Sequence, residues 1–383
     1  MKTLYLHVGT PKTGTTAIQN FLGDNKSKLK ELGVCYPKFK THYKRARSVR
    51  NGHWLCRGIA SEEEYDEFMN TLFSEAEKYP KLVMTDEGLW NFNHDEDFWK
   101  NLKKTLEEHD ICLKVIVYFR RQDSYAFSYW GQKVKELSYF YYTFSEYIYS
   151  GEYLEKSELD YTKVLNHVAE SIGKENIIVR PYEKDQYEGS RGDILSDFLK
   201  ILGVEWQDDF KMVKRHNNVS MADSVLEAKR LMNTVKAFRK KNVTLRLYLE
   251  RIQDELEAEG KLGRRTGVDA RFRKRLLNKF KECNEYIARE YLGREDGILF
   301  REQIKTYDNE LDTFKRSELE EIYRRLLDYN DADKKRVFER ADLQGITEKA
   351  LKRFDKEAER EKKIKRKIVV MARRLGMIDI PYK

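Results

Sequence analysis

Residues 3–22 read TLYLHVGTPKTGTTAIQNFL. Thr3 to Val8 is a short apolar run that stops at a glycine, which is typical of a buried strand. Thr15 to Leu22 has apolar residues at helical spacing, and residues 9–14 form a loop between glycines. A strand, a glycine-bounded loop and a helix N-terminus in this order bind phosphate, because backbone N–H groups and the helix dipole face the anion. We therefore predict a phosphate-binding loop here.

The loop departs from the nucleotide-triphosphatase pattern G-x-x-x-x-G-K-[ST] at one position. Gly9, Gly14 and Thr16 fit that pattern, but Thr15 stands where the pattern has lysine. The lysine of this loop is Lys12, which would place the ammonium at the mouth of the loop, away from a terminal γ-phosphate.

Three further apolar runs read as strands, at Lys81–Thr85, Leu113–Phe119 and Asn176–Arg180, and helical patterns separate all of them. Strands that alternate with helices predict βαβ units and a mostly parallel sheet covered on both faces. After about Met221 the patterns are helical to the end of the chain. We therefore predict an α/β fold, with a three-layer, P-loop-like parallel sheet and a helical C-terminal extension.

The chain has 383 residues, of which 74 are basic and 65 acidic, so its formal net charge is +9. Residues 352–374 alone contain eleven Lys/Arg and four Asp/Glu, a balance of +7. The basic character therefore belongs mostly to the tail, and we expect no nucleic-acid partner. We predict a catalytic domain over 1–305, helical in its part 226–305, and a charged helical extension over 306–383.

The cysteines and the hydropathy pattern indicate in which cellular compartment the protein is expected. There is no C-x-x-C pair, which argues against a zinc site and a disulfide scaffold and suits a reducing compartment. No stretch approaches 18 apolar residues, and the N-terminus lacks a signal-peptide core. We expect a cytoplasmic protein. The four cysteines are Cys35, Cys56, Cys112 and Cys283.

Thr10 to Gln19 resembles the 5′-phosphosulfate loop of sulfotransferases that use 3′-phosphoadenosine 5′-phosphosulfate (PAPS). Members of this family carry a second element at the end of a later strand, an arginine followed eight residues on by a serine, and both hold the 3′-phosphate. Arg120 and Ser128 have that spacing after the run that ends at Phe119. Arg121 would replace Arg120 if the strand ended one residue later.

Weaker similarities to bacterial sulfotransferases associated with surface polysaccharides continue along the chain and extend over about residues 1–300. They lie at Arg180–Glu183, Gly192–Leu199, Arg215–Ser220 and Asn284–Tyr291. The resemblance implies the sulfotransferase fold, PAPS as donor, adenosine 3′,5′-bisphosphate (PAP) as product, and a hydroxyl or amine of a glycan or lipid-linked glycan as acceptor. It implies in-line transfer without a metal, because a sulfuryl group carries less charge than a phosphoryl group.

The resemblance also assigns roles within the loop. Lys12 would stabilise the charge that develops on the bridging oxygen as the bond to sulfur breaks. Thr13 and Gly14 would contribute backbone donors, and Thr15 and Thr16 would hold the 5′-phosphate by hydroxyl and N–H groups.

Further from the loop, the resemblance implies contacts to the rest of the nucleotide. Arg120 would meet the 3′-phosphate with a bidentate fork, and Ser128 would add a hydroxyl bond. Arg215 and Ser220 belong to a segment similar to a late loop that closes over the nucleotide.

The acceptor needs a general base, and the sequence leaves two candidates. Glu87 ends the second predicted strand at the carboxyl edge of the sheet, where open α/β folds place their ligands. His53 lies in the stretch after the first helix. The two could also act together, with Glu87 orienting His53. The basic residues from Lys38 to Arg50 indicate either a solvated loop or a rim of the site that attracts an anionic glycan or the cofactor itself.

Two other classes of function compete with this interpretation. A P-loop kinase or other nucleotide phosphotransferase requires a lysine before Thr16, which is absent, and an acidic residue at a strand end for Mg²⁺, which Asp86 would mimic. A non-enzymatic protein with a degenerate cofactor fold would have lost Lys12 or Arg120, and the chain keeps both.

The tail predicts one amphipathic helix. Ile364, Ile368, Met371 and Leu375 recur at spacings that form one apolar stripe among basic residues. Such a helix either docks on the catalytic domain or on a second subunit in a homodimer, or lies as a peripheral anchor on the inner membrane face, where it would meet a lipid-linked glycan.

Overall fold

The computed structural model describes residues 2–39, 50–56, 58–91, 96–149, 159–212, 221, 223–262, 270–304, 315–333 and 336–374. The chain divides into two compact units. The first consists of Met1–Ser128, Gly151–Asn218 and Ala270–Lys305, and the second of Tyr129–Ser150, Val219–Asp269 and Thr306–Lys383.

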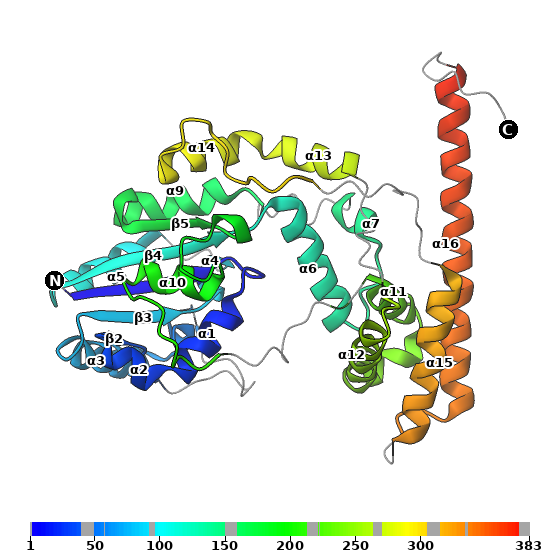
Figure 1. The fold of residues 1–383 in the computed structure, drawn as a ribbon, viewed down its shortest axis with the longest axis horizontal. Coiled ribbons are helices and arrows are strands. Elements are labelled where there is room, and N and C mark those ends of the chain that lie inside the picture. The colour runs from blue at the N-terminus through cyan, green and yellow to red at the C-terminus, as the bar shows by residue number, and fades with distance from the viewer. Residues whose placement is uncertain are drawn as a thin grey trace. The chain divides into compact units, whose positions relative to one another are not determined.

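A five-stranded parallel sheet forms the centre of the first unit, with the strand order β2-β3-β1-β4-β5 (Figure 1). The strands are β1 (Lys2–Gly9), β2 (Val34–Cys35), β3 (Lys81–Thr85), β4 (Ile111–Phe119) and β5 (Ile177–Pro181). The four predicted strands are confirmed, and β2, which has two residues, was not predicted.

The register places the end of β1 between the ends of β3 and β4. His7 pairs with Thr85 of β3 and with Ile116 of β4, so the segments that follow these three strands leave the sheet at the same edge. Residues 9–14 follow β1 at this edge, Asp86 follows β3, and Arg120 follows β4. Side chains that are distant in sequence are thereby gathered where open parallel sheets bind their ligands.

Helices cover both faces of the sheet. One face packs against α1 (Thr15–Asp24), α2 (Lys26–Glu31) and α10 (Ile194–Ile201), through a core that includes Phe21 and Phe198. The other face packs against a larger core contributed by α3 (Glu62–Ala76), α5 (Glu96–Glu107), α9 (Tyr161–Ile172) and α14 (Lys281–Leu292). The predicted three-layer α/β fold with a parallel sheet is confirmed.

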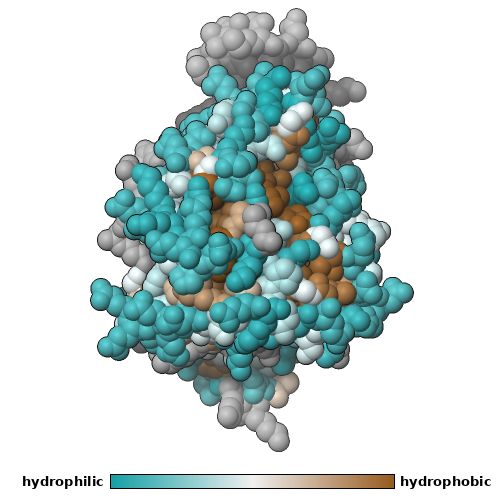
Figure 2. Space-filling model, turned by 90° about the vertical axis from the view of Figure 1, so that its left-hand side faces the viewer, coloured by the Kyte–Doolittle hydropathy of each residue, from teal (hydrophilic) through white to brown (hydrophobic). Residues whose placement is uncertain are grey.

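Figure 2 views the molecule from the left-hand side of Figure 1, the side on which β1 begins. Hydrophilic side chains cover most of this face, and hydrophobic residues reach the surface in its central part. The loop of residues 9–14 follows the other end of β1, so the predicted site lies at the opposite edge of the sheet.

Shorter elements complete the first unit. The helix predicted over Arg271–Tyr291 is divided near Phe280 into α13 and α14. The remaining elements are η1 (His53–Leu55), α4 (Gly88–Asn91), the first half of α6 (Gln122–Glu136), η2 (Lys174–Asn176), η3 (Lys184–Gln186) and α13 (Ala270–Lys279).

The second unit is helical in its described residues. Leu319, Ile322 and Leu326 of α15 and Leu343 of α16 are buried, and the Tyr323 hydroxyl donates to the carbonyl of Ala228 at 3.0 Å. Its helices are the end of α6, α7 (Phe144–Tyr149), α11 (Asp223–Met232), η5 (Lys236–Lys241), α12 (Asn242–Ala258), α15 (Arg316–Ala332) and α16 (Arg340–Arg374).

The division of the chain differs from the predicted boundary between 1–305 and 306–383. Residues 129–150 and 219–269 group with the C-terminal segment instead of with the sheet. The physical reason is packing: Arg230 of α11, itself 1% exposed, pairs with Glu357 of α16 at 2.6 Å, so the buried side of α11 faces the C-terminal helices. The first part of the predicted helical part, up to residue 269, therefore groups with the predicted extension, and 270–305 group with the sheet.

None of the helices in the described ranges combines the length and the apolar character that a membrane crossing requires.

Candidate functional site

The loop after β1 has a backbone that only certain residues adopt easily. Gly9, Lys12 and Gly14 have φ values of 107°, 68° and 76°. Positive φ is strained for a residue with a Cβ, so glycine suits two of these positions, and Lys12 is held there by its surroundings.

Thr10 anchors this loop to the end of β4, and Thr13 closes the loop on Thr10. The backbone N–H and the hydroxyl of Thr10 both donate to the carbonyl of Tyr118, at 3.0 and 3.1 Å. The Thr13 hydroxyl donates to the carbonyl of Thr10 at 2.5 Å. The hydroxyl of Thr13 is thus committed inside the loop, so its backbone N–H is the group it can offer to a ligand.

The first turn of α1 suits an anion. The N-cap residue Gly14 has no side chain that could cap the helix, and the first turn contains no acidic residue. The first intrahelical bonds run from Ala17 and Ile18 to the carbonyl of Gly14, so the N–H groups of Thr15 and Thr16 precede the helical ladder. These donors, together with the half-buried Lys12, are suited to a phosphate or a similar anionic group.

Gly14 is also required by close packing. A Cβ at this position would lie 2.9 Å from Cδ1 of Ile194 and 3.4 Å from Cε2 of Tyr182. The segments after β5 therefore press directly on the start of α1 and define the shape of the loop.

Arg120 reaches the loop from the end of β4. Its Nη1 donates to the carbonyl of Lys12 at 3.1 Å, and its guanidinium lies over the ring of Tyr182 at 5.7 Å. Its own carbonyl accepts a bond from the Tyr161 hydroxyl at 2.6 Å, which fixes the backbone at the strand end. The structure thus brings the two predicted nucleotide motifs together.

Arg121 points into a different set of contacts. It is 7% exposed and forms a two-bond ion pair with Asp123, and it also donates to the carbonyl of Glu302. Arg273 joins the same carboxylate at 3.3 Å. Arg121 is therefore part of a buried ion cluster that holds the 270–304 segment, and of the two arginines Arg120 is the one that contacts the loop.

The structure describes the position of one of the three other residues predicted to contact the nucleotide. Ser128 lies half-buried on α6, in the helix that follows Arg120. Arg215 and Ser220 lie outside the described residues.

Glu87 lies directly beside the phosphate-binding loop. A Cβ on Gly9 would lie 3.3 Å from the Cβ of Glu87. The Oε2 atom of Glu87 is buried, and it has no hydrogen-bond partner among the described residues. A carboxylate oxygen in this position is suited to a proton or a donor that a ligand brings.

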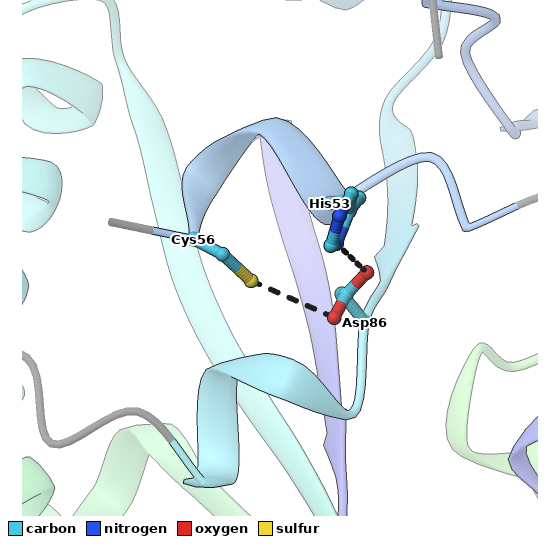
Figure 3. Close-up of side chains that lie close together, drawn as sticks. All are labelled: His53, Cys56 and Asp86. Atoms are coloured by element: carbon cyan, nitrogen blue, oxygen red, sulfur yellow. Dashed lines mark hydrogen bonds and ion pairs between the residues drawn. The ribbon is translucent and has the colours of Figure 1, made fainter. Parts of the chain in front are cut away.

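His53 does not pair with Glu87, as one of the predictions supposed, but with Asp86, the residue before it. Nδ1 of His53 lies 3.1 Å from Oδ2 of Asp86 (Figure 3). His53 and Cys56 lie on the two ends of the short η1 helix, and both side chains face this carboxylate, with the thiol 3.6 Å from Oδ1.

Asp86 has further donors around it, and it is 0% exposed. Arg50 donates to both of its oxygens, through Nε at 2.8 Å and through Nη2, and the N–H of Gly88 donates at 2.7 Å. Burial alone would raise the pKa of Asp86, but the bonds from His53 and Arg50 outweigh it and hold that pKa below its ordinary value. Asp86 is therefore ionised at neutral pH.

The ligand-type atoms of His53, Cys56 and Asp86 lie within 4.8 Å of one another, a spacing that a metal ion could bridge. The guanidinium of Arg50 already neutralises the carboxylate, however, and would repel a cation at the same position. Burial also raises the pKa of the Cys56 thiol, which disfavours the thiolate that binds metals. The arrangement fits an internal ion pair better than a metal centre.

Asp86 and Arg50 were missed as site residues by sequence reasoning. The sequence pattern indicates Asp86 only as a Mg²⁺ ligand, and Arg50 only as one of the basic residues from Lys38 onward. The ion pair lies at one end of that basic stretch, and 40–49 lie outside the described residues. The one sequence signal was the acidic pair at the strand end, and it does not say which member turns toward His53.

No protein-family model matches the chain. It is 26% identical over 285 residues to an "Uncharacterized protein" of Archaeoglobus fulgidus. The aligned region covers 71% of this chain and 73% of that protein. The crystal structure of a sulfotransferase from Alicyclobacillus acidocaldarius superimposes with a TM-score of 0.36 at 15% identity, over 65% of this chain and 95% of the other. A superposition at this level carries no weight for the function.

Proposed function

We propose that this chain transfers a sulfuryl group from PAPS to a hydroxyl or amine of a glycan acceptor. The observation that carries the proposal is the contact between Arg120 and the carbonyl of Lys12, two residues separated by 108 positions. It joins the motif that resembles the 5′-phosphosulfate loop to the motif that resembles the 3′-phosphate site, as one nucleotide with phosphates at both ends requires.

In this proposal PAPS supplies an activated sulfuryl group on a good leaving phosphate. The N–H groups of Thr13 to Thr16 and the hydroxyls of Thr15 and Thr16 hold the 5′-phosphate at the start of α1. Lys12 donates to the bridging oxygen, where negative charge grows as the bond to sulfur breaks. No metal is required for these roles, since the chain's own donors face the anion.

The other end of the nucleotide is held by the residues after β4. Arg120 takes the 3′-phosphate with its guanidinium fork, because a planar fork matches two phosphate oxygens. Ser128 adds a hydroxyl bond, and Arg215 and Ser220 close over the nucleotide. On the acceptor side, Glu87 or His53 removes the proton from the attacking group.

The phosphotransferase alternative loses support at Asp86. A kinase would need this strand-end carboxylate for Mg²⁺, but Arg50 and His53 already bind it. A sulfotransferase that acts on a non-glycan acceptor stays a distinct alternative, because the glycan rests on the resemblance to polysaccharide sulfotransferases.

A cytoplasmic location, a homodimer and a peripheral membrane contact belong to the same proposal. The first part of α16 packs within its own unit, as the buried Leu343, Ile346 and Ala350 indicate. The helix backbone continues to Arg374, and the apolar stripe that begins at Ile364 would be the part that meets an anionic membrane surface.

Thermal shift separates the two nucleotide classes. PAP without metal should raise the melting temperature, because the loop and Arg120 bind both of its phosphates. ATP with Mg²⁺ should have a smaller effect. Stabilisation by ATP with Mg²⁺ and none by PAP would favour the phosphotransferase.

A further inference from the structure

The hydrogen bond between His53 and Asp86 determines which nitrogen of the imidazole carries the proton. An ionised carboxylate accepts hydrogen bonds and cannot donate them, and the low pKa of Asp86 keeps it ionised. Nδ1 of His53, at 3.1 Å from Oδ2, must therefore be the N–H donor. In the neutral ring the lone pair then lies on Nε2, which is the basic nitrogen.

The backbone that carries His53 is fastened to β3 by the two residues before it. The N–H of Gly52 donates to the carbonyl of Thr85 at 3.2 Å, and the Asn51 amide donates to the carbonyl of Val83 at 3.0 Å. The Asn51 oxygen accepts from the N–H of Thr85 at 2.9 Å. The side chain of Asn51 thus takes the place of a neighbouring strand at this edge of β3.

Glycine is favoured at position 52 because the two backbones approach closely. A Cβ there would lie 3.2 Å from the carbonyl carbon and oxygen of Thr85. His53 is therefore held by a short, specific attachment to the strand end that precedes Asp86, and its ring position does not depend on the ion pair alone.

This attachment brings His53 to the edge that carries the phosphate-binding loop. The N–H of Asp86 donates to the carbonyl of His7 at 3.0 Å, two residues before Gly9. Glu87, the next residue, packs against Gly9. Asp86 thus leaves the sheet beside the point where β1 enters the loop.

We propose that His53 is the general base of the sulfuryl transfer and that Asp86 is its positioning residue, with Arg50 limiting the charge that Asp86 exerts on the ring. This assignment rests on the proposed function, and it chooses between the two bases that the sequence left open. A carboxylate that accepts from both the imidazole and the guanidinium holds the ring in one orientation.

The sulfuryl transfer forms one bond to sulfur and breaks another. The lone pair of the acceptor oxygen or nitrogen forms the new bond to sulfur, while the bond from sulfur to the bridging oxygen breaks. The bridging oxygen keeps that electron pair and remains on the 5′-phosphate, facing Lys12. The acceptor proton moves to Nε2 of His53, Nδ1 keeps its own proton toward Asp86, and the imidazolium later releases the acceptor proton to water.

The first test is independent of any acceptor. Nuclear magnetic resonance of the full chain with labelled histidine reports the tautomer of each of the seven imidazoles, and His53→Gln assigns the signal of His53. The wild type should show His53 with the proton on Nδ1, and Asp86→Asn should convert it to the Nε2–H tautomer. The exposed Asp209→Asn is the matched control. A wild-type ring with its proton on Nε2 would overturn the assignment.

The second test uses the pH dependence of catalysis. Labelled PAPS is offered to a chitosan oligosaccharide as an amine probe and to dextran as a hydroxyl probe, and sulfate release to water is measured in the same samples. The charged and titratable groups around the Asp86 carboxylate, among the described residues, include His7, Tyr36, Arg50, His53, Cys56 and Glu87.

Two variants should move the acidic limb of log(kcat/KM) in opposite directions. Asp86→Asn removes a negative charge beside the ring, so the limb should move to lower pH, and kcat should fall by about 10²-fold or more. Arg50→Gln leaves Asp86 uncompensated, so the limb should move to higher pH, whereas Arg50→Lys keeps the positive charge and should hold the limb in place.

PAP affinity, measured for every variant, separates the outcomes. If the wild type binds no PAP and consumes no PAPS, the proposed function fails, and the tautomer experiment still judges the pairing of His53 with Asp86. If PAPS is consumed, but the limb stays in place in both variants and Glu87→Gln alone abolishes the reaction, then Glu87 is the base and the present assignment is wrong.

Discussion

Nη1 of Arg120 donates a hydrogen bond to the backbone carbonyl of Lys12 at 3.1 Å. Arg120 follows β4 and Lys12 lies in the loop after the neighbouring strand β1, so the contact spans two adjacent strand ends. It fixes how far apart the loop and the guanidinium lie. A nucleotide bound at the loop would therefore lie within reach of this guanidinium.

Replacing Arg120 tests this relationship. Arg120→Ala should weaken PAP binding by about 2–3 kcal/mol, the scale of a lost charged hydrogen bond, which is roughly a 30- to 150-fold rise in Kd. Titration calorimetry measures it, and adenosine 5′-phosphate, which lacks the 3′-phosphate, serves as the comparison ligand. An equal loss for both nucleotides would show that Arg120 does not hold the 3′-phosphate.

The neighbouring Arg121 should behave differently. Arg121→Ala leaves Asp123 buried beside Arg273 without its two-bond partner, so the unfolding free energy should fall by about 3–5 kcal/mol. Denaturant titration measures the loss. A variant that folds as stably as the wild type but no longer binds PAP would transfer the 3′-phosphate role to Arg121.

Lys12 should act on the reaction rather than on binding. Lys12→Ala should lower kcat by about a hundredfold or more, because one donor to the leaving oxygen is lost in the transition state. PAP affinity should change much less, since the backbone donors and Arg120 remain. Steady-state rates with PAPS, combined with PAP titration, check both parts, and full activity in this variant would remove Lys12 from the mechanism.

The shape of the loop depends on Gly14, and a second glycine provides a matched comparison. Gly14→Ala combines a positive φ with an overlap of 2.9 Å against Ile194, whereas Gly293→Ala has a φ of 64° and no atom within 4 Å of the added Cβ. The strain costs about 1–2 kcal/mol in each, and the overlap should add about 1–3 kcal/mol in Gly14→Ala alone. Equal melting temperatures of the two variants would contradict the packing described here.

A buried lysine in the second unit predicts a pH dependence of stability. Lys229 is 0% exposed, donates to the carbonyl of Val134 at 3.3 Å and to the Asn233 side chain, and lies over the ring of Phe238. Burial is the main cause that lowers the pKa of Lys229 to about 7, and the charge of Arg246 contributes to the same effect.

The sign of the effect follows from proton binding. Between pH values of about 7 and about 10 the unfolded chain keeps the Lys229 proton and the folded chain does not, so stability gained from this residue rises with pH by at most about 1.4 kcal/mol per pH unit. Lys229→Met should flatten that rise in denaturant titrations, and the exposed Lys236→Met should not. An unchanged slope in Lys229→Met would mean that the lysine stays charged in the folded protein.

The strands could be predicted from the sequence because each is a local pattern. β3 was predicted at its observed bounds, and β1 and β4 within two residues, since apolar runs bounded by glycine or charge mark buried strands. The two residues of β2 are too few to form a pattern. The position of Arg120 directly after β4 could be predicted because a strand end is itself a local property, and its role toward a nucleotide stays a prediction.

The pairing of His53 with Asp86 could not be predicted in the same way. It depends on Asn51 and Gly52 docking on β3 over a separation of more than thirty residues, which no periodicity expresses. The grouping of α11 with α16 was missed for a related reason, since an amphipathic pattern shows that a helix has a buried face but not which neighbour covers it.

The central claim, sulfuryl transfer from PAPS, is tested most directly by following the label of PAPS with the full chain in the presence of a chelator. We expect labelled sulfate to appear on a glycan probe or in water in a one-to-one ratio with PAP. We expect no transfer of the terminal phosphate from ATP with Mg²⁺. Intact PAPS after prolonged incubation, together with phosphate transfer from ATP, would contradict it.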